Sequence, residues 1–146
     1  MTHEDPRVRA RAVRALIPHA GEMCLLERIV EVSDVELLCA TFSHRSATNP
    51  LRRAGRLAAL HLAEYGAQTM AIHGGLQTAG EAARGGMLVA IRDLRLQVER
   101  LDDLDAELTI HAVKLVANAT GRIYSFTARA ARRELGAGRI SVMFVS

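Results

Sequence analysis

The stretch LHLAEYGAQTMAIHGG, residues 60–75, decides the fold of this chain. The segment from Leu57 to His73 is rich in alanine, leucine and methionine and contains no proline, so it is predicted to be a helix. Its apolar side chains cover nearly the whole circumference, and a helix that is apolar on all sides is buried. A carboxylate in such a helix is costly to desolvate unless it is paired or protonated. Glu64 is therefore a candidate for function.

Strand patterns flank this helix on both sides. Two β-rich runs between Met23 and Phe42 surround a short polar turn and predict an antiparallel pair. After a glycine-bounded loop over 74–86, apolar and polar residues alternate in four further runs. These runs are LRLQVER (94–100), ELTIHAVKLVA (107–117), GRIYSFTARAA (121–131) and GRISVMFV (138–145). A short N-terminal helix is expected over residues 6–17.

One long helix is buried in a small domain only if the sheet curls around it. The predicted fold class is therefore α+β, with an antiparallel sheet wrapped around one central helix at about residues 57–73, in a single domain over 1–146. Such a sheet leaves edge strands that need a cover. We therefore expect a homodimer or a heterodimer.

Composition narrows the function classes. The chain has 146 residues and a net charge of +3, carried mostly by arginine, but only two tyrosines, three phenylalanines and no tryptophan. A stacking platform for nucleic acid is thus poorly supported. No apolar run has the length of a membrane span, and the first residues lack the apolar stretch of a signal peptide, so a cytoplasmic protein is expected. Cys24 and Cys39 lack metal-type spacing, and we expect no metal site.

Four residues of the predicted helix share one stripe: Leu57, His61, Glu64 and Gln68. A carboxylic acid in a dry environment can hold a proton near neutral pH and donate it, which would make Glu64 a general acid. The alternative is a structural glutamate tied to an arginine or to backbone amides. Sequence alone leaves both interpretations open.

A histidine is the usual partner of such an acid, because its pKa lies near working pH. His44 lies in the polar loop just before the helix, and loops on rigid scaffolds often carry catalytic side chains. His19 and His61 are the alternatives. His73 is expected to close the helix, where an imidazolium interacts favourably with the C-terminal dipole.

Two segments resemble the hot-dog-fold 3-hydroxyacyl-acyl carrier protein dehydratases. IPHAGEMCLLERIVEV (17–32) is similar to the opening of that family, and LHLAEYGAQTMA (60–71) to its central helix. The resemblance covers about residues 12–146 and is closer to the atypical dehydratase-like subfamily of aryl-polyene clusters, whose pattern is HxxxxNPLRxxGRL…EYxAQ. The matching residues are His44, Asn49, Pro50, Leu51, Arg52, Gly55, Arg56, Leu57, Glu64, Tyr65, Ala67 and Gln68.

This resemblance implies a dimer of hot-dog subunits in which a substrate thioester enters on its own phosphopantetheine arm, with no further cofactor. His44 would remove the α-proton and Glu64 would assist the departure of the β-hydroxyl. Backbone N–H groups between Arg56 and Ala59, including those of Leu57 and Ala58, would polarise the thioester carbonyl. Gln68 would orient Glu64 or a water.

Three basic side chains of the preceding loop, Arg52, Arg53 and Arg56, could attract an acidic acyl carrier protein, or could be ordinary surface charge. The predicted activity is dehydration of a 3-hydroxyacyl thioester on a carrier protein to a trans-2-enoyl thioester. One alternative is an acyl thioesterase that uses Glu64. Another is a non-catalytic subunit of a heterodimeric dehydratase.

Overall fold

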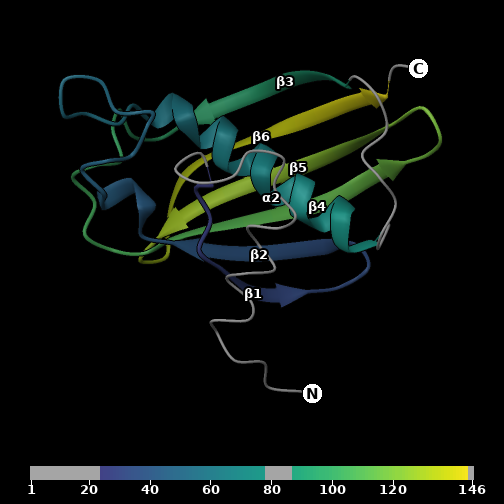
Figure 1. The fold of residues 1–146 in the computed structure, drawn as a ribbon, viewed down its shortest axis with the longest axis horizontal. Coiled ribbons are helices and arrows are strands. Elements are labelled where there is room, and N and C mark those ends of the chain that lie inside the picture. The colour runs from purple at the N-terminus through teal and green to yellow at the C-terminus, as the bar shows by residue number, and fades with distance from the viewer. Residues whose placement is uncertain (1–23, 78–86, 145–146) are drawn as a thin grey trace.

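The computed structural model describes residues 24–77 and 87–144, which form one antiparallel sheet and one long helix (Figure 1). The sheet has six strands in the order β1-β2-β4-β5-β6-β3. The strands are β1 (Arg28–Val32), β2 (Glu36–Thr41), β3 (Met87–Leu96), β4 (Leu108–Ala117), β5 (Gly121–Ala130) and β6 (Arg133–Phe144). Two 3-10 turns, η2 (Ser43–Arg45) and η3 (Ala59–His61), precede the helix α2 (Leu62–Gln77).

The helix α2 lies across one face of the sheet and packs against β2, β4, β5 and β6 (Figure 1). Its buried residues point in all directions around the axis and include Leu62, Tyr65, Met70 and Ile72. The prediction of a buried central helix within an antiparallel α+β fold is confirmed. The edge strands are β1 and β3.

Helix and sheet meet most closely at Gly66. A methyl group on this residue would lie 2.7 Å from two ring atoms of Phe126, a buried residue of β5. Only a residue without a side chain allows the two backbones to approach this far. This contact sets the depth of α2 in the curved sheet, and with it the position of Glu64 two residues earlier.

The predicted bounds of the helix were wrong at both ends. Residues 57–59 are extended, because the Leu57 C=O accepts from Leu101 N–H and the Ala59 N–H donates to Glu99 C=O. At the other end the helix continues through Gly74 and Gly75 to Gln77. His73 is therefore not a C-terminal cap: it is fully buried, with Nδ1 on the Tyr124 hydroxyl and Nε2 on the Ser33 C=O.

The strand predictions were mostly confirmed. The β1–β2 hairpin, β4 and β5 lie where the sequence placed them. The predicted bounds of β3 were wrong: it begins at Met87 and ends at Leu96, after which the chain leaves the sheet to pair with Leu57–Ala59. β6 begins at Arg133, because Ala131 and Arg132 both adopt positive φ and form a two-residue hairpin turn.

The predicted N-terminal helix over 6–17 and His19 lie outside the described residues. Within residues 24–77 and 87–144, no helix combines the length and the apolar character needed to cross a membrane.

Candidate active site

Glu64 lies in the first turn of α2 and is half-buried. Gln68, one turn later, donates from Nε2 to Glu64 Oε1 at 3.1 Å, and its own Oε1 accepts the Leu25 N–H at 2.9 Å. Because Leu25 fixes which end of the Gln68 amide faces Glu64, Gln68 is a donor to the carboxyl group. The expected contact between Gln68 and Glu64 is confirmed. Within the described chain, Glu64 forms no ion pair, so the arginine-tied alternative is not observed.

His44 lies in η2 and is completely enclosed by its own protomer. Its Nε2 lies 3.0 Å from the Leu104 C=O, and a carbonyl can only accept, so Nε2 carries the proton of the neutral ring. Nδ1 is then a free lone pair, buried and without a hydrogen-bond partner in the described part of the chain. Burial lowers the pKa of His44 and keeps the ring neutral.

A buried hydroxyl network joins the loop of His44 to α2. Ser43 donates to the Leu25 C=O at 2.6 Å, so its oxygen is free to accept from the Tyr65 hydroxyl at 2.8 Å. Asn49 donates from Nδ2 to the Tyr65 oxygen at 3.2 Å and to the Ser43 C=O at 3.0 Å. Tyr65 follows Glu64, and Ser43 precedes His44. The two candidate catalytic side chains are thus held in one frame, although no hydrogen bond or ion pair joins them directly.

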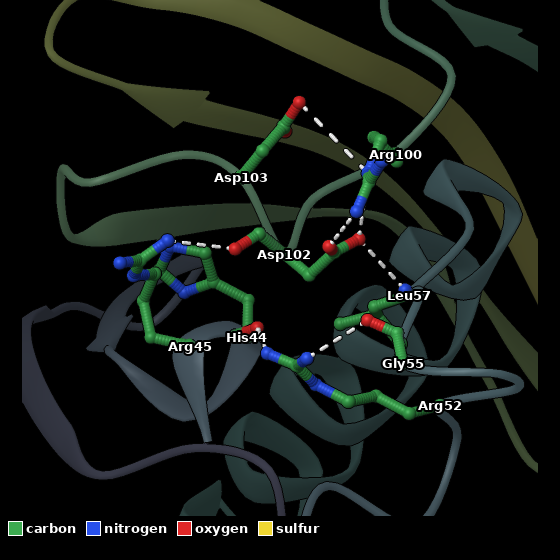
Figure 2. Close-up of polar contacts among 8 residues, drawn as sticks. All are labelled: His44, Arg45, Arg52, Gly55, Leu57, Arg100, Asp102 and Asp103. Carbon is green, nitrogen blue, oxygen red and sulfur yellow. Dashed lines mark hydrogen bonds and ion pairs between the residues drawn. The ribbon is translucent and has the colours of Figure 1, made fainter. Parts of the chain in front are cut away.

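The chain that enters α2 is held by an acidic residue of the β3–β4 connection (Figure 2). Asp102 accepts the Leu57 N–H at 2.8 Å through Oδ1 and forms an ion pair with Arg100, while its C=O accepts from Arg45 at 2.7 Å. The Asp102 side chain is only 6% exposed. The hydrogen bond from Arg100 is the main cause that lowers the pKa of Asp102 and keeps it ionised.

This arrangement narrows the choice of carbonyl-polarising amides. The Arg56 N–H donates to Arg53 C=O, the Leu57 N–H to Asp102 and the Ala59 N–H to Glu99 C=O. The expectation that Leu57 offers a substrate-binding group was wrong, because its N–H and C=O are bonded and its side chain is in the core. Ala58 is exposed, and its N–H has no partner within the described residues.

The three arginines of the preceding loop differ in their surroundings. Arg52 is half-buried and donates to the C=O groups of Gly55 and His44, at 3.0 and 3.1 Å, so it holds the loop together rather than projecting into solvent (Figure 2). Arg53 and Arg56 are exposed and pair through their backbones across a tight turn in which Ala54 and Gly55 have positive φ. The turn presents both guanidinium groups at one place on the surface.

His61 ends η3 and is partly exposed, three residues before Glu64. Among the described residues it is the histidine near Glu64 that is open to solvent. Cys39 is buried, and desolvation raises the pKa of its thiol to about 12, so it remains a neutral core residue. No group of three histidine, cysteine or acidic residues within 24–77 and 87–144 is arranged to hold a metal ion.

Sequence reasoning missed Asp102 and the role of Tyr65. Asp102 was part of LDDLD, which was interpreted only as a turn, and Tyr65 was one apolar position of the helix. Their partners Leu57 and Ser43 are 45 and 22 residues away. A buried position for an aspartate or a tyrosine hydroxyl is a signal of function, but it is visible only in the folded chain.

An antiparallel sheet curled around one long helix, with a carboxyl group near the start of that helix, defines a hot-dog-fold protein. Similar solved structures include the dehydratase heterocomplex ApeI:P from Xenorhabdus doucetiae, with a TM-score of 0.78 and 23% identity over 92% of this chain and 91% of that chain. Zebra fish thioesterase superfamily member 2 gives 0.63 and 12% over 99% and 100%. A hypothetical thioesterase with coenzyme A from Streptococcus pneumoniae TIGR4 gives 0.57 and 12% over 82% and 85%.

The model of the ApeP-like family, described as ApeP dehydratase, matches residues 11–145. The chain therefore belongs to the ApeP-like dehydratase family, and the family resemblance carried by the NPLR and EYxAQ motifs is confirmed. A comparison with curated proteins finds no match.

Proposed function

We propose that this chain removes water from 3-hydroxyacyl thioesters bound to an acyl carrier protein and that Glu64 is the proton donor. The observation that carries the proposal is the half-buried Glu64 carboxyl group, which is oriented by Gln68 and has no cationic partner in the described chain. An acid that is oriented but not neutralised is available to a substrate.

The proposed reaction uses three groups. A base removes the proton from C2, and the electron pair of that bond forms the C2–C3 double bond. The C3–O bond breaks, and Glu64 gives its proton to the leaving hydroxyl, which departs as water. The Ala58 N–H donates to the thioester oxygen as negative charge develops there. The phosphopantetheine arm arrives with the substrate, and this chemistry needs no other cofactor.

For the base we propose His44, with His61 as the alternative. A neutral ring with a free Nδ1 lone pair and a loop tied to α2 support His44. Partial exposure next to Glu64 supports His61. His44→Gln keeps an amide N–H that can reach the Leu104 C=O but has no basic nitrogen, so it separates the two. A loss of turnover of about a hundredfold or more is expected for the true base, and a near-normal rate for the other.

For the quaternary structure we propose a dimer with a second hot-dog subunit along β3. This edge strand is ten residues long and exposes Val89 (54%) and Ile91 (39%). Long apolar edges are sites for strand pairing. The similar fold of the ApeI:P heterocomplex supports a heterodimer, and a homodimer is the alternative. The complete enclosure of His44 favours the case in which this chain is active only with its partner.

Purified protein is incubated with a 3-hydroxyacyl carrier protein, and mass is followed with and without a co-purified second subunit. Loss of water in either case supports the proposal, and silence until the second subunit is added assigns the heterodimer. Release of free acid would support a thioesterase, the activity named for two fold neighbours. Glu64→Gln is expected to lower turnover at least about a hundredfold. Glu31→Gln, an exposed change on β1, is the matched control.

A further inference from the structure

We infer that Asp102 is a positioning residue that fixes the direction of the Ala58 N–H toward the thioester carbonyl. This inference rests on the proposed function, because it assigns Ala58 to the reacting carbonyl. It concerns an aspartate from the β3–β4 connection that reaches the chain entering α2 (Figure 2).

The backbone pairing of the entry segment sets the direction of the Ala58 amide. Residues 57–59 pair with 99–101 through two bonds, Leu101 N–H to Leu57 C=O at 2.8 Å and Ala59 N–H to Glu99 C=O at 2.9 Å. In extended chain the amides of successive residues point to opposite sides. The Ala58 N–H, between these two residues, therefore points away from 99–101, and its direction comes from this pairing rather than from a helix dipole.

Without Asp102 this short pairing would be incomplete. The Leu57 N–H points to the same side as its C=O, but the backbone pairing extends no further than Leu101. The Asp102 carboxylate supplies the missing acceptor at 2.8 Å. A buried backbone N–H without a partner is unfavourable, so the entry segment would rearrange to find one.

The carboxylate itself is held from two other elements. Arg100 pairs with the Asp102 side chain, also donating to Oδ1 from Nε at 3.1 Å, and Arg45 of η2 donates to the Asp102 C=O. Both arginines come from segments that border the site, and Arg45 follows His44. Asp102 therefore ties together the entry to α2, the strand segment 99–101 and the loop that carries His44.

The consequence is a donor whose position is set before the substrate arrives. Removing one such donor from an oxyanion site costs about 10²–10³ in kcat, and a displaced donor is expected to lose a part of this. The donor bonds most strongly to the charged oxygen that develops during reaction. The loss should therefore appear in kcat, while KM, which reports binding of the whole carrier-bound substrate, changes little.

The test compares Asp102→Ala, Asp102→Asn and the neighbour Asp103→Asn in the dehydrating preparation. We expect Asp102→Ala to lower kcat by about tenfold or more with KM within about twofold. Asp102→Asn keeps an oxygen that accepts the Leu57 N–H and should recover most of the rate. Asp103 is exposed and lies 3.9 Å from Arg100, so Asp103→Asn should match the wild type. A loss that Asn does not rescue, or one confined to KM, would overturn the inference.

A second measurement does not depend on turnover. In labelled protein, a 3-hydroxyacyl pantetheine thioester should shift the Ala58 amide resonance, whereas the thioether that lacks the carbonyl should not, and Asp102→Ala should remove the difference. If the wild type never dehydrates but shows this difference, the proposed function fails and the positioning role of Asp102 stands. If the wild type dehydrates and Asp102→Ala leaves kcat and the resonance unchanged, only the inference fails. Asp102→Leu replaces the alanine variant if that variant does not fold, and unfolding of both would show a role in folding instead.

Discussion

Substituting Gly66 by alanine should destabilise the protein although alanine is the better helix former. Gly66 is buried in the middle of α2, and the added methyl group would lie 2.7, 2.7 and 3.0 Å from three atoms of the Phe126 ring. The ring has little freedom to withdraw, because Gly138 approaches it closely as well: a methyl group there would lie 3.1 Å from Phe126 Cε1. Helix and sheet must therefore separate locally.

The expected size follows from two opposing effects. Overpacking of a well-packed core costs about 1–3 kcal/mol. Replacing glycine by alanine within a helix returns about 1 kcal/mol. The net loss is about 1–2 kcal/mol, which corresponds to a melting temperature lower by about 2–8 °C at about 2–4 °C per kcal/mol for a chain of this size. Urea denaturation should show a lower midpoint with an unchanged slope.

Gly74→Ala is the matched control in the same helix. A methyl group there would meet the end of the Arg122 side chain, which is flexible, rather than a ring held in the core. Arg122 can swing aside, so the helix gain of up to about 1 kcal/mol should remain. The reasoning is refuted if Gly66→Ala is as stable as the wild type, or if both variants lose the same free energy of unfolding.

The remaining predictions concern charge and pH. Reversing the exposed pair Arg53 and Arg56 to glutamate should lower kcat/KM for a carrier-bound substrate by about tenfold, at about 0.2–1 kcal/mol for each lost ion pair with added repulsion. The rate with a short pantetheine thioester should not change, and an equal loss with both substrates would exclude a docking role. Burial lowers the pKa of His44 and His73. The unfolded chain then binds more protons, so stability is complete above pH 6.5 and falls as pH decreases below it, by up to about 1.4 kcal/mol per pH unit for each histidine. Denaturation midpoints between pH 7.5 and 5 measure this slope, which should be smaller in His44→Gln and which would contradict the reasoning if it were flat.

The central helix was predictable because its signal is local. An apolar segment without proline forms a buried helix in almost any fold, and strands β4 and β5 alternate between a buried and a more exposed face. The helix ends were not predictable in this way. Gly74 and Gly75 are ordinary stop signals, yet tertiary packing carries the helix past them to Gln77. The extended state of residues 57–59 depends on partners more than forty residues later in the chain.

The site shows the same division between local and distant signals. Glu64 was identifiable because one carboxylate stands out in an apolar helix. Asp102 lies among other acidic residues in LDDLD, and nothing in its neighbourhood distinguishes it from Asp103 or Asp105. The difference arises only when the chain folds: Asp103 and Asp105 remain exposed, whereas Asp102 meets a backbone N–H that has no other acceptor. A catalytic acid can be recognised by what surrounds it in the sequence, but a residue that positions another group is defined by a partner that the sequence places far away.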